Sequence, residues 1–167
     1  GRITAEDTVA VFGSGVVGLG AIAAASRRGA RVIVVDLDDR KLEVARRAGA
    51  AEVVNARVTE PRAALGALTD GDGPDVVIEA VGTPDTYRLA IDAVAYTGRV
   101  VYVGYAAEDV PFTTKLFILK ELDILGSRNS LALIPPGLQL LARYEEAARS
   151  LITHRFPIAE VNDAYEL

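Results

Sequence analysis

The sequence predicts an α/β fold: a doubly wound parallel sheet of six strands, order 3-2-1-4-5-6, with residues 1–167 forming a single domain. Two observations predict it. Short β-branched runs alternate with alanine- and leucine-rich segments of about a dozen residues, the pattern of parallel strands joined by right-handed crossover helices. This alternation occurs as two successive β-α-β-α-β units, which predicts the doubly wound strand order.

In the first half, glycine and aspartate mark the ends of the elements. The apolar run before Gly13 predicts a strand, and the alanine-rich run that stops at Gly29 predicts a helix. RVIVV is unbroken, as expected of a strand buried on both faces, and Asp38 or Asp39 can cap the next helix. The expected strands are Thr8–Phe12, Arg31–Val35 and Glu52–Asn55, and the expected helices are Val16–Arg28, Asp39–Ala48 and Pro61–Leu68.

The turn TDGDGP restarts the alternation in the second half. Thr83 is a candidate helix cap, and Pro135, Pro136 and Gly137 are expected to break the chain before a last long helix. The closing run VNDAYEL has the pattern of the first turns of another helix. The expected strands are Asp75–Glu79, Gly98–Val103 and Leu122–Gly126, and the expected helices are Pro84–Ala95, Thr114–Lys120 and Leu138–Ser150.

A phosphate-binding motif, GSGVVG, lies directly between the first strand and the first helix. Gly13 permits the tight turn, Gly15 lets a pyrophosphate approach the backbone, and Gly18 lets the helix pack near the strand. The backbone N–H groups at the helix start, with Val16 and Val17, supply a positive pole for phosphates.

Asp36 completes the motif at the end of the second strand, about 20 residues after the glycines. Its carboxylate can accept hydrogen bonds from both hydroxyls of an adenosine ribose, and it would repel a 2′-phosphate, so it favours NAD over NADP. The alternative that Asp36 only begins a turn stays open. Rossmann-type methyltransferases share this geometry, but the acid they usually carry in or before the first turn is missing from VFGSGVVG.

Composition excludes several function classes. The net charge is −5 with both signs mixed along the chain, which argues against nucleic acid as the main partner. There is no cysteine and only one histidine, His154, too few for a conventional zinc site or a histidine-based catalytic centre. No apolar run approaches the roughly 20 residues of a membrane span and no signal peptide is visible, so a cytoplasmic protein is expected.

Beyond these motifs, Val11–Ala56 resembles the cofactor-binding domain of medium-chain dehydrogenases, the zinc-dependent alcohol dehydrogenase superfamily. The match continues through DVVIEAVGTPDTYRLAIDAVAYTGRVVYVG, KELDILGSRNS and LITHRFPIAEVNDAYEL, most like the polyol, threonine and sugar-acid dehydrogenase branch. The resemblance implies that Lys41 reaches the adenosine ribose. It also implies that two loops contact the ribose and nicotinamide side, formed by Val81 with Gly82 and by Val103 with Gly104.

The resemblance further implies NAD as cofactor, with zinc and the proton-relay residues in a separate domain that precedes this segment. We therefore expect a fragment that contains no catalytic or metal-ligating residue and oxidises no alcohol by itself. Alternatives are a zinc-free quinone reductase relative and a stand-alone NAD(H)-binding module. A homodimer or tetramer is expected through the sheet edge formed by Val110–Thr113 and Leu122–Gly126.

Overall fold

The computed structural model describes residues 1–129, 133–143, 145, 149, 152 and 154–166. It confirms the predicted sheet, which has six parallel strands in the order β3-β2-β1-β4-β5-β6. The strands lie within one residue of their predicted bounds: β1 Thr8–Phe12, β2 Arg31–Asp36, β3 Glu52–Asn55, β4 Val76–Glu79, β5 Arg99–Tyr102 and β6 Asp123–Gly126.

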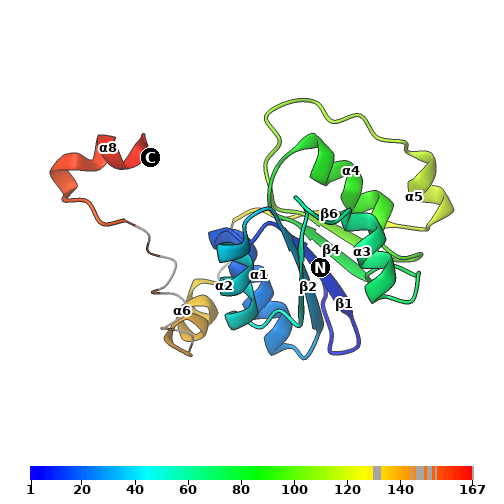
Figure 1. The fold of residues 1–167 in the computed structure, drawn as a ribbon, viewed down its shortest axis with the longest axis horizontal. Coiled ribbons are helices and arrows are strands. Elements are labelled where there is room, and N and C mark those ends of the chain that lie inside the picture. Colours follow the sequence, from blue (N-terminus) through cyan, green and yellow to red (C-terminus); the bar gives the residue numbers. More distant parts are fainter. Residues whose placement is uncertain (130–132, 144, 146–148, 150–151, 153, 167) are drawn as a thin grey trace.

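Helices cover both faces of the sheet, with α1 and α2 on one side and α3 and α4 on the other (Figure 1). Alternate residues of the central strands divide between two apolar cores. Val9 and Val11 pack toward α1 and α2, whereas Ala10 and Phe12 pack toward α3 and α4. The helices are α1 Val16–Arg27, α2 Asp39–Arg47, α3 Pro61–Leu68, α4 Pro84–Ala93 and α5 Lys115–Leu119.

The C-terminal elements lie outside this three-layer body (Figure 1). They are α6 Ile134–Arg143, the 3-10 turn Ile158–Glu160 and α8 Val161–Tyr165, which confirms the helix expected in VNDAYEL. The expected break at Pro135, Pro136 and Gly137 is wrong, because α6 already begins at Ile134. Proline fits the first turn of a helix, where its missing N–H would have no intrahelical partner. The predicted stretch beyond Arg143 includes residues outside the described ones.

The predicted sheet edge is only half right. β6 is the terminal strand of the sheet, but Val110–Thr113 lies in the loop before α5 and pairs with no strand. Phe112 in this run packs instead against Phe117 of α5 and near Tyr87 and Tyr102. Burial of an aromatic ring in this cluster replaces the strand pairing that the apolar sequence suggested.

Candidate functional site

The glycine-rich loop turns sharply from β1 into α1. Gly13 has φ of +86°, a conformation that favours glycine, and its N–H donates to the carbonyl of Val35 on β2 at 2.9 Å. A Cβ on Gly18 would lie 1.9 Å from the carbonyl oxygen of Gly13, so only glycine lets α1 pack this closely. The tight turn and the close helix packing predicted for Gly13 and Gly18 are confirmed.

The N-terminus of α1 faces open space. Gly15 is its N-cap, no side chain accepts from the first turn, and nothing lies within 4 Å of the position of a Cβ on Gly15. Val16 and Val17 are 72% and 57% exposed, respectively. In contrast, Asp38, Glu60 and Thr83 cap α2, α3 and α4 with their side chains. The first turn of α1 therefore keeps donors and dipole available to an external anion.

Asp36 lies at the end of β2, beside the glycine loop at the end of β1. Its Oδ2 accepts from the backbone N–H and the hydroxyl of Ser14, both at 2.7 Å. Its Oδ1 accepts from the N–H groups of Leu37 at 2.6 Å and Asp38 at 3.1 Å. Burial raises the pKa of Asp36, but these four hydrogen bonds outweigh it and hold the pKa below its ordinary value. The carboxylate is thus ionised and oriented at the edge of the loop.

The loops after β4 and β5 form the other side of the site. The register pairs Glu79 of β4 with Phe12 of β1 and with Tyr102 of β5, so the three strands end at the same level. Val81 is 47% exposed, and its Cγ2 atom would lie 2.8 Å from a Cβ on Gly13. The β4 loop and the glycine loop are therefore in contact.

Close backbone packing explains both glycines of these loops. Gly82 has φ of +87°, and a Cβ there would lie 2.7 Å from the carbonyl oxygen of Tyr105. A Cβ on Gly104 would lie 2.5 Å from the nitrogen of Gly82. Gly82 and Gly104, each with the valine before it, thus bring the two loops together at the carboxyl edge of the sheet, where open α/β sheets bind ligands.

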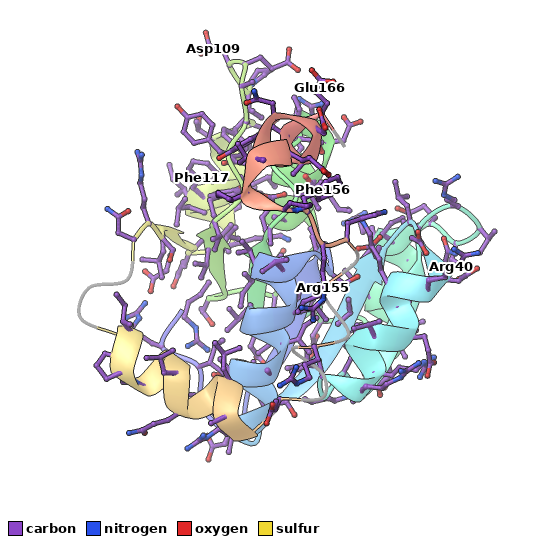
Figure 2. All side chains as sticks on the ribbon, turned by 90° about the vertical axis from the view of Figure 1, so that its left-hand side faces the viewer. Arg40, Asp109, Phe117, Arg155, Phe156 and Glu166 are labelled. Carbon is purple, nitrogen blue, oxygen red and sulfur yellow. The ribbon has the colours of Figure 1, made fainter. Side chains whose placement is uncertain are left out.

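Lys41 lies in the first turn of α2 and is exposed, as is its neighbour Arg40, which Figure 2 labels. Arg40 and Lys41 follow Asp36 by four and five residues. Among the described residues, no hydrogen bond joins either side chain to Asp36. The structure thus brings the glycines, Asp36 and both valine–glycine loops to one edge, and leaves Lys41 at its outer rim.

Two residues of this edge had no assigned role from sequence. Ser14 is only 1% exposed and bonds Asp36, and Glu79 is 0% exposed and bonds the β4 loop. For Ser14, the sequence feature that could have indicated a role is a hydroxyl between the two glycines of the motif. For Glu79, the signal was a carboxylate that ends an otherwise apolar strand.

Within the described part of the chain, no group of three or more histidine, cysteine, aspartate or glutamate residues could hold a metal ion. Among the same residues, no helix is long and apolar enough to cross a membrane. His154 is exposed, and its ring centroid lies 6.2 Å from that of Phe156.

The family model described as zinc-binding dehydrogenase matches residues 16–143, which include α1 and every strand after β1. The chain belongs to the zinc-binding dehydrogenase family. It is 37% identical to a D-xylulose reductase of Scheffersomyces stipitis over 179 aligned residues, which cover 100% of this chain and 49% of that protein. The chain thus spans about half the length of the curated relatives it matches.

Solved structures of other dehydrogenases share this fold. A protein of Escherichia coli CFT073 described as a short chain alcohol dehydrogenase, solved with NADH, has a TM-score of 0.84 and 28% identity, covering 100% of this chain and 50% of that chain. A zinc-binding dehydrogenase of Sinorhizobium meliloti 1021, solved with NADP, has a TM-score of 0.80 and 29% identity, covering 86% and 43%. The predicted family and fold are confirmed.

Proposed function

We propose that this chain is the NAD-binding domain of a zinc-dependent alcohol or polyol dehydrogenase. The observation that carries the proposal is the pairing of two features at one edge. These are the uncapped N-terminus of α1 beside Gly15 and the ionised Asp36 at the end of the neighbouring strand. Membership of the zinc-binding dehydrogenase family and the NADH bound to a structural neighbour support it.

The residues present fit a dinucleotide. The open space at Gly15 admits a pyrophosphate, and the free N–H groups of the first turn of α1 would donate to it. Asp36 would accept from the ribose hydroxyls in exchange for, or in addition to, the bonds from Ser14. Lys41, five residues after Asp36 in the first turn of α2, could reach the same ribose from the rim.

The other half of the cofactor would lie over the second half of the sheet. In a doubly wound sheet the dinucleotide crosses the point where the strand order reverses, here between β1 and β4. Val81 with Gly82 and Val103 with Gly104 would then border the nicotinamide riboside. When bound, NAD supplies the hydride acceptor. The residues of this chain bind it and fix its orientation.

Alcohol oxidation itself would need a further set of residues. A zinc ion that polarises the alcohol belongs, on this proposal, to a catalytic domain outside residues 1–167. We also propose that the domain works in a homodimer or tetramer joined through β6, because this terminal strand leaves Ile124 39% exposed. Soluble, cytoplasmic action fits such an enzyme.

A matched pair of α1 variants tests the cofactor site. Gly15→Val and Gly20→Val both place a side chain in open space, but only Gly15 lies at the start of the helix. We expect Gly15→Val to weaken NAD binding about tenfold or more by occupying the phosphate position, and Gly20→Val to leave it within about twofold. Titration calorimetry with NAD measures both, with thermal unfolding as the folding control. Equal affinities for the two variants would contradict the phosphate site.

A further inference from the structure

Glu79 is a fully buried carboxyl group at the end of β4. Its Oε1 accepts three hydrogen bonds: from the N–H of Val81 at 2.9 Å, the N–H of Gly82 at 2.8 Å and the hydroxyl of Thr86 at 2.8 Å. Among the described residues, no lysine, arginine or histidine forms an ion pair with it. All three donors come from the loop and the first turn of α4, so this single oxygen fixes the conformation of the loop that follows β4.

The same residue also holds the loop after β5. The backbone carbonyl of Glu79 accepts from the N–H groups of Val103 and Gly104, both at 2.9 Å. A Cβ on Gly104 would lie 2.4 Å from Oε2 of Glu79, so the side chain fills the space that glycine leaves free. Glu79 is therefore in direct contact with both valine–glycine loops.

Burial of this carboxyl group lowers the stability of the folded protein, so folding alone does not explain its presence. Oε2 is buried and accepts no hydrogen bond from any residue that the structure describes. The three residues before it on β4, Val76–Ile78, are all apolar and buried, so the strand packs well without a polar group. A buried group with an unsatisfied oxygen at a binding edge is a candidate for a functional role.

We infer that Glu79 is a positioning residue for the nicotinamide half of the cofactor, acting through the Val81–Gly82 turn and the Gly104 backbone that it holds together. The inference rests on the proposed NAD site. It assigns no contact between Glu79 and the cofactor. On this inference the site has two halves. Asp36 and the glycine loop bind the adenosine and the phosphates, and Glu79 positions the loops that border the nicotinamide riboside.

The experiment uses the 167-residue chain and two ligands, NADH and ADP. ADP carries the adenosine and the diphosphate but no nicotinamide riboside, so it reports on the first half alone. We expect Glu79→Ala to weaken NADH binding about tenfold, because the turn loses three hydrogen bonds to one acceptor, while ADP binding stays within about twofold. Glu79→Gln keeps the acceptor oxygen and is expected to restore most of the NADH affinity.

Asp36→Ser is the matched control for the other half, and it is expected to weaken NADH and ADP together. If Glu79→Ala does not fold, Thr86→Val removes one of the three donors and is expected to weaken NADH selectively by a smaller factor. A parallel loss of NADH and ADP in the Glu79 and Thr86 variants would show a merely structural role and overturn the inference, as would unchanged affinity for both. Wild-type chain that binds neither ligand would instead refute the proposed function, and the inference with it.

Discussion

Ser14 and Asp36 are joined by two hydrogen bonds of 2.7 Å, one from the backbone and one from the hydroxyl, both to the same carboxylate oxygen. Ser14 is the second residue of the glycine motif and Asp36 ends the neighbouring strand. The glycine loop and the Asp36 carboxylate are thus hydrogen-bonded into one unit, and these are the two parts of the site proposed to bind the phosphates and the adenosine ribose.

The first prediction concerns this unit. Ser14→Ala removes the hydroxyl donor, and we expect it to lower the free energy of unfolding by about 1 kcal/mol, the typical net value of one such bond. A double-mutant cycle with Asp36→Asn, measured by urea unfolding, isolates the pair. Strictly additive effects of the two substitutions would show that the hydroxyl and the carboxylate are not energetically coupled.

The second prediction concerns the loss of stability at low pH through Asp7. Asp7 is buried and paired with Arg99, and it also accepts from the N–H of Thr4 at 2.6 Å. Burial raises the pKa of Asp7, but the Thr4 hydrogen bond and the Arg99 guanidinium outweigh it and lower the pKa below 3.8. A carboxyl with a depressed folded-state pKa stabilises the protein above its unfolded-state pKa, and this stabilisation is lost as the pH falls through the folded-state value.

Asp7→Asn should therefore lower the free energy of unfolding near neutral pH by about 2 kcal/mol or more, because the largely buried Arg99 loses its carboxylate and keeps only neutral acceptors such as the carbonyls of Gly1 and Arg2. The difference between wild type and variant should shrink progressively as the pH falls below the ordinary pKa of an aspartate, about 3.8. Asp109→Asn, at the exposed tip of the loop between β5 and α5, is the control and should change little (Figure 2). A difference that is constant across this pH range would contradict the assignment.

The third prediction concerns the end of α4. The Nζ of Lys120 donates to the carbonyls of Ile91, Asp92 and Val94 at 3.2, 2.9 and 2.7 Å, respectively. We expect Lys120→Met to destabilise the protein by about 2 kcal/mol, because the last carbonyls of the helix lose their donor. Lys115→Met, exposed on α5, provides the control. Matching unfolding midpoints for the two variants would mean that this cap adds nothing to stability.

A fourth prediction concerns assembly. Ile124→Lys puts a charge on the terminal strand β6 and should convert a self-associated chain into monomers, because edge charges block strand pairing. Val58→Lys changes a residue just after β3, the strand at the opposite edge, and should leave association unaffected. Sedimentation velocity at micromolar concentrations measures both. A wild-type chain that is monomeric throughout this range would remove the basis for the β6 interface.

Local signals predicted most of the fold from sequence. Glu52–Asn55 and Pro61–Leu68 have the bounds expected of them, and Asp38 and Thr83 cap the helices as predicted. These outcomes depend on turn and cap chemistry, which acts within a few residues. The prediction that Val110–Thr113 belongs to the sheet edge was wrong. Phe112 packs instead near Tyr87 and Tyr102, and contacts between residues distant in sequence cannot be inferred from a local apolar run.

The candidate site shows the same division. The spacing of glycines and the position of Asp36 follow a pattern that sequence alone carries, so their placement at one edge was predictable. The contacts of Glu79 were not, because they depend on how two loops meet after β4 and β5 are paired. The carboxylate at the end of an apolar strand marks Glu79 as unusual, but it does not indicate which donors bond to it.

The most direct test of the central claim compares NAD with NADP on wild type and on Asp36→Ser. If Asp36 binds the adenosine ribose, the variant should lose about 1.5–3 kcal/mol of NAD binding free energy, the value of hydrogen bonds to a charged group. Its NADP affinity should be unchanged or improved, because the carboxylate that repels a 2′-phosphate is gone and Arg40 and Lys41 lie nearby. Calorimetric titration gives both affinities. An equal loss for the two cofactors would make Asp36 a turn residue and contradict the NAD assignment.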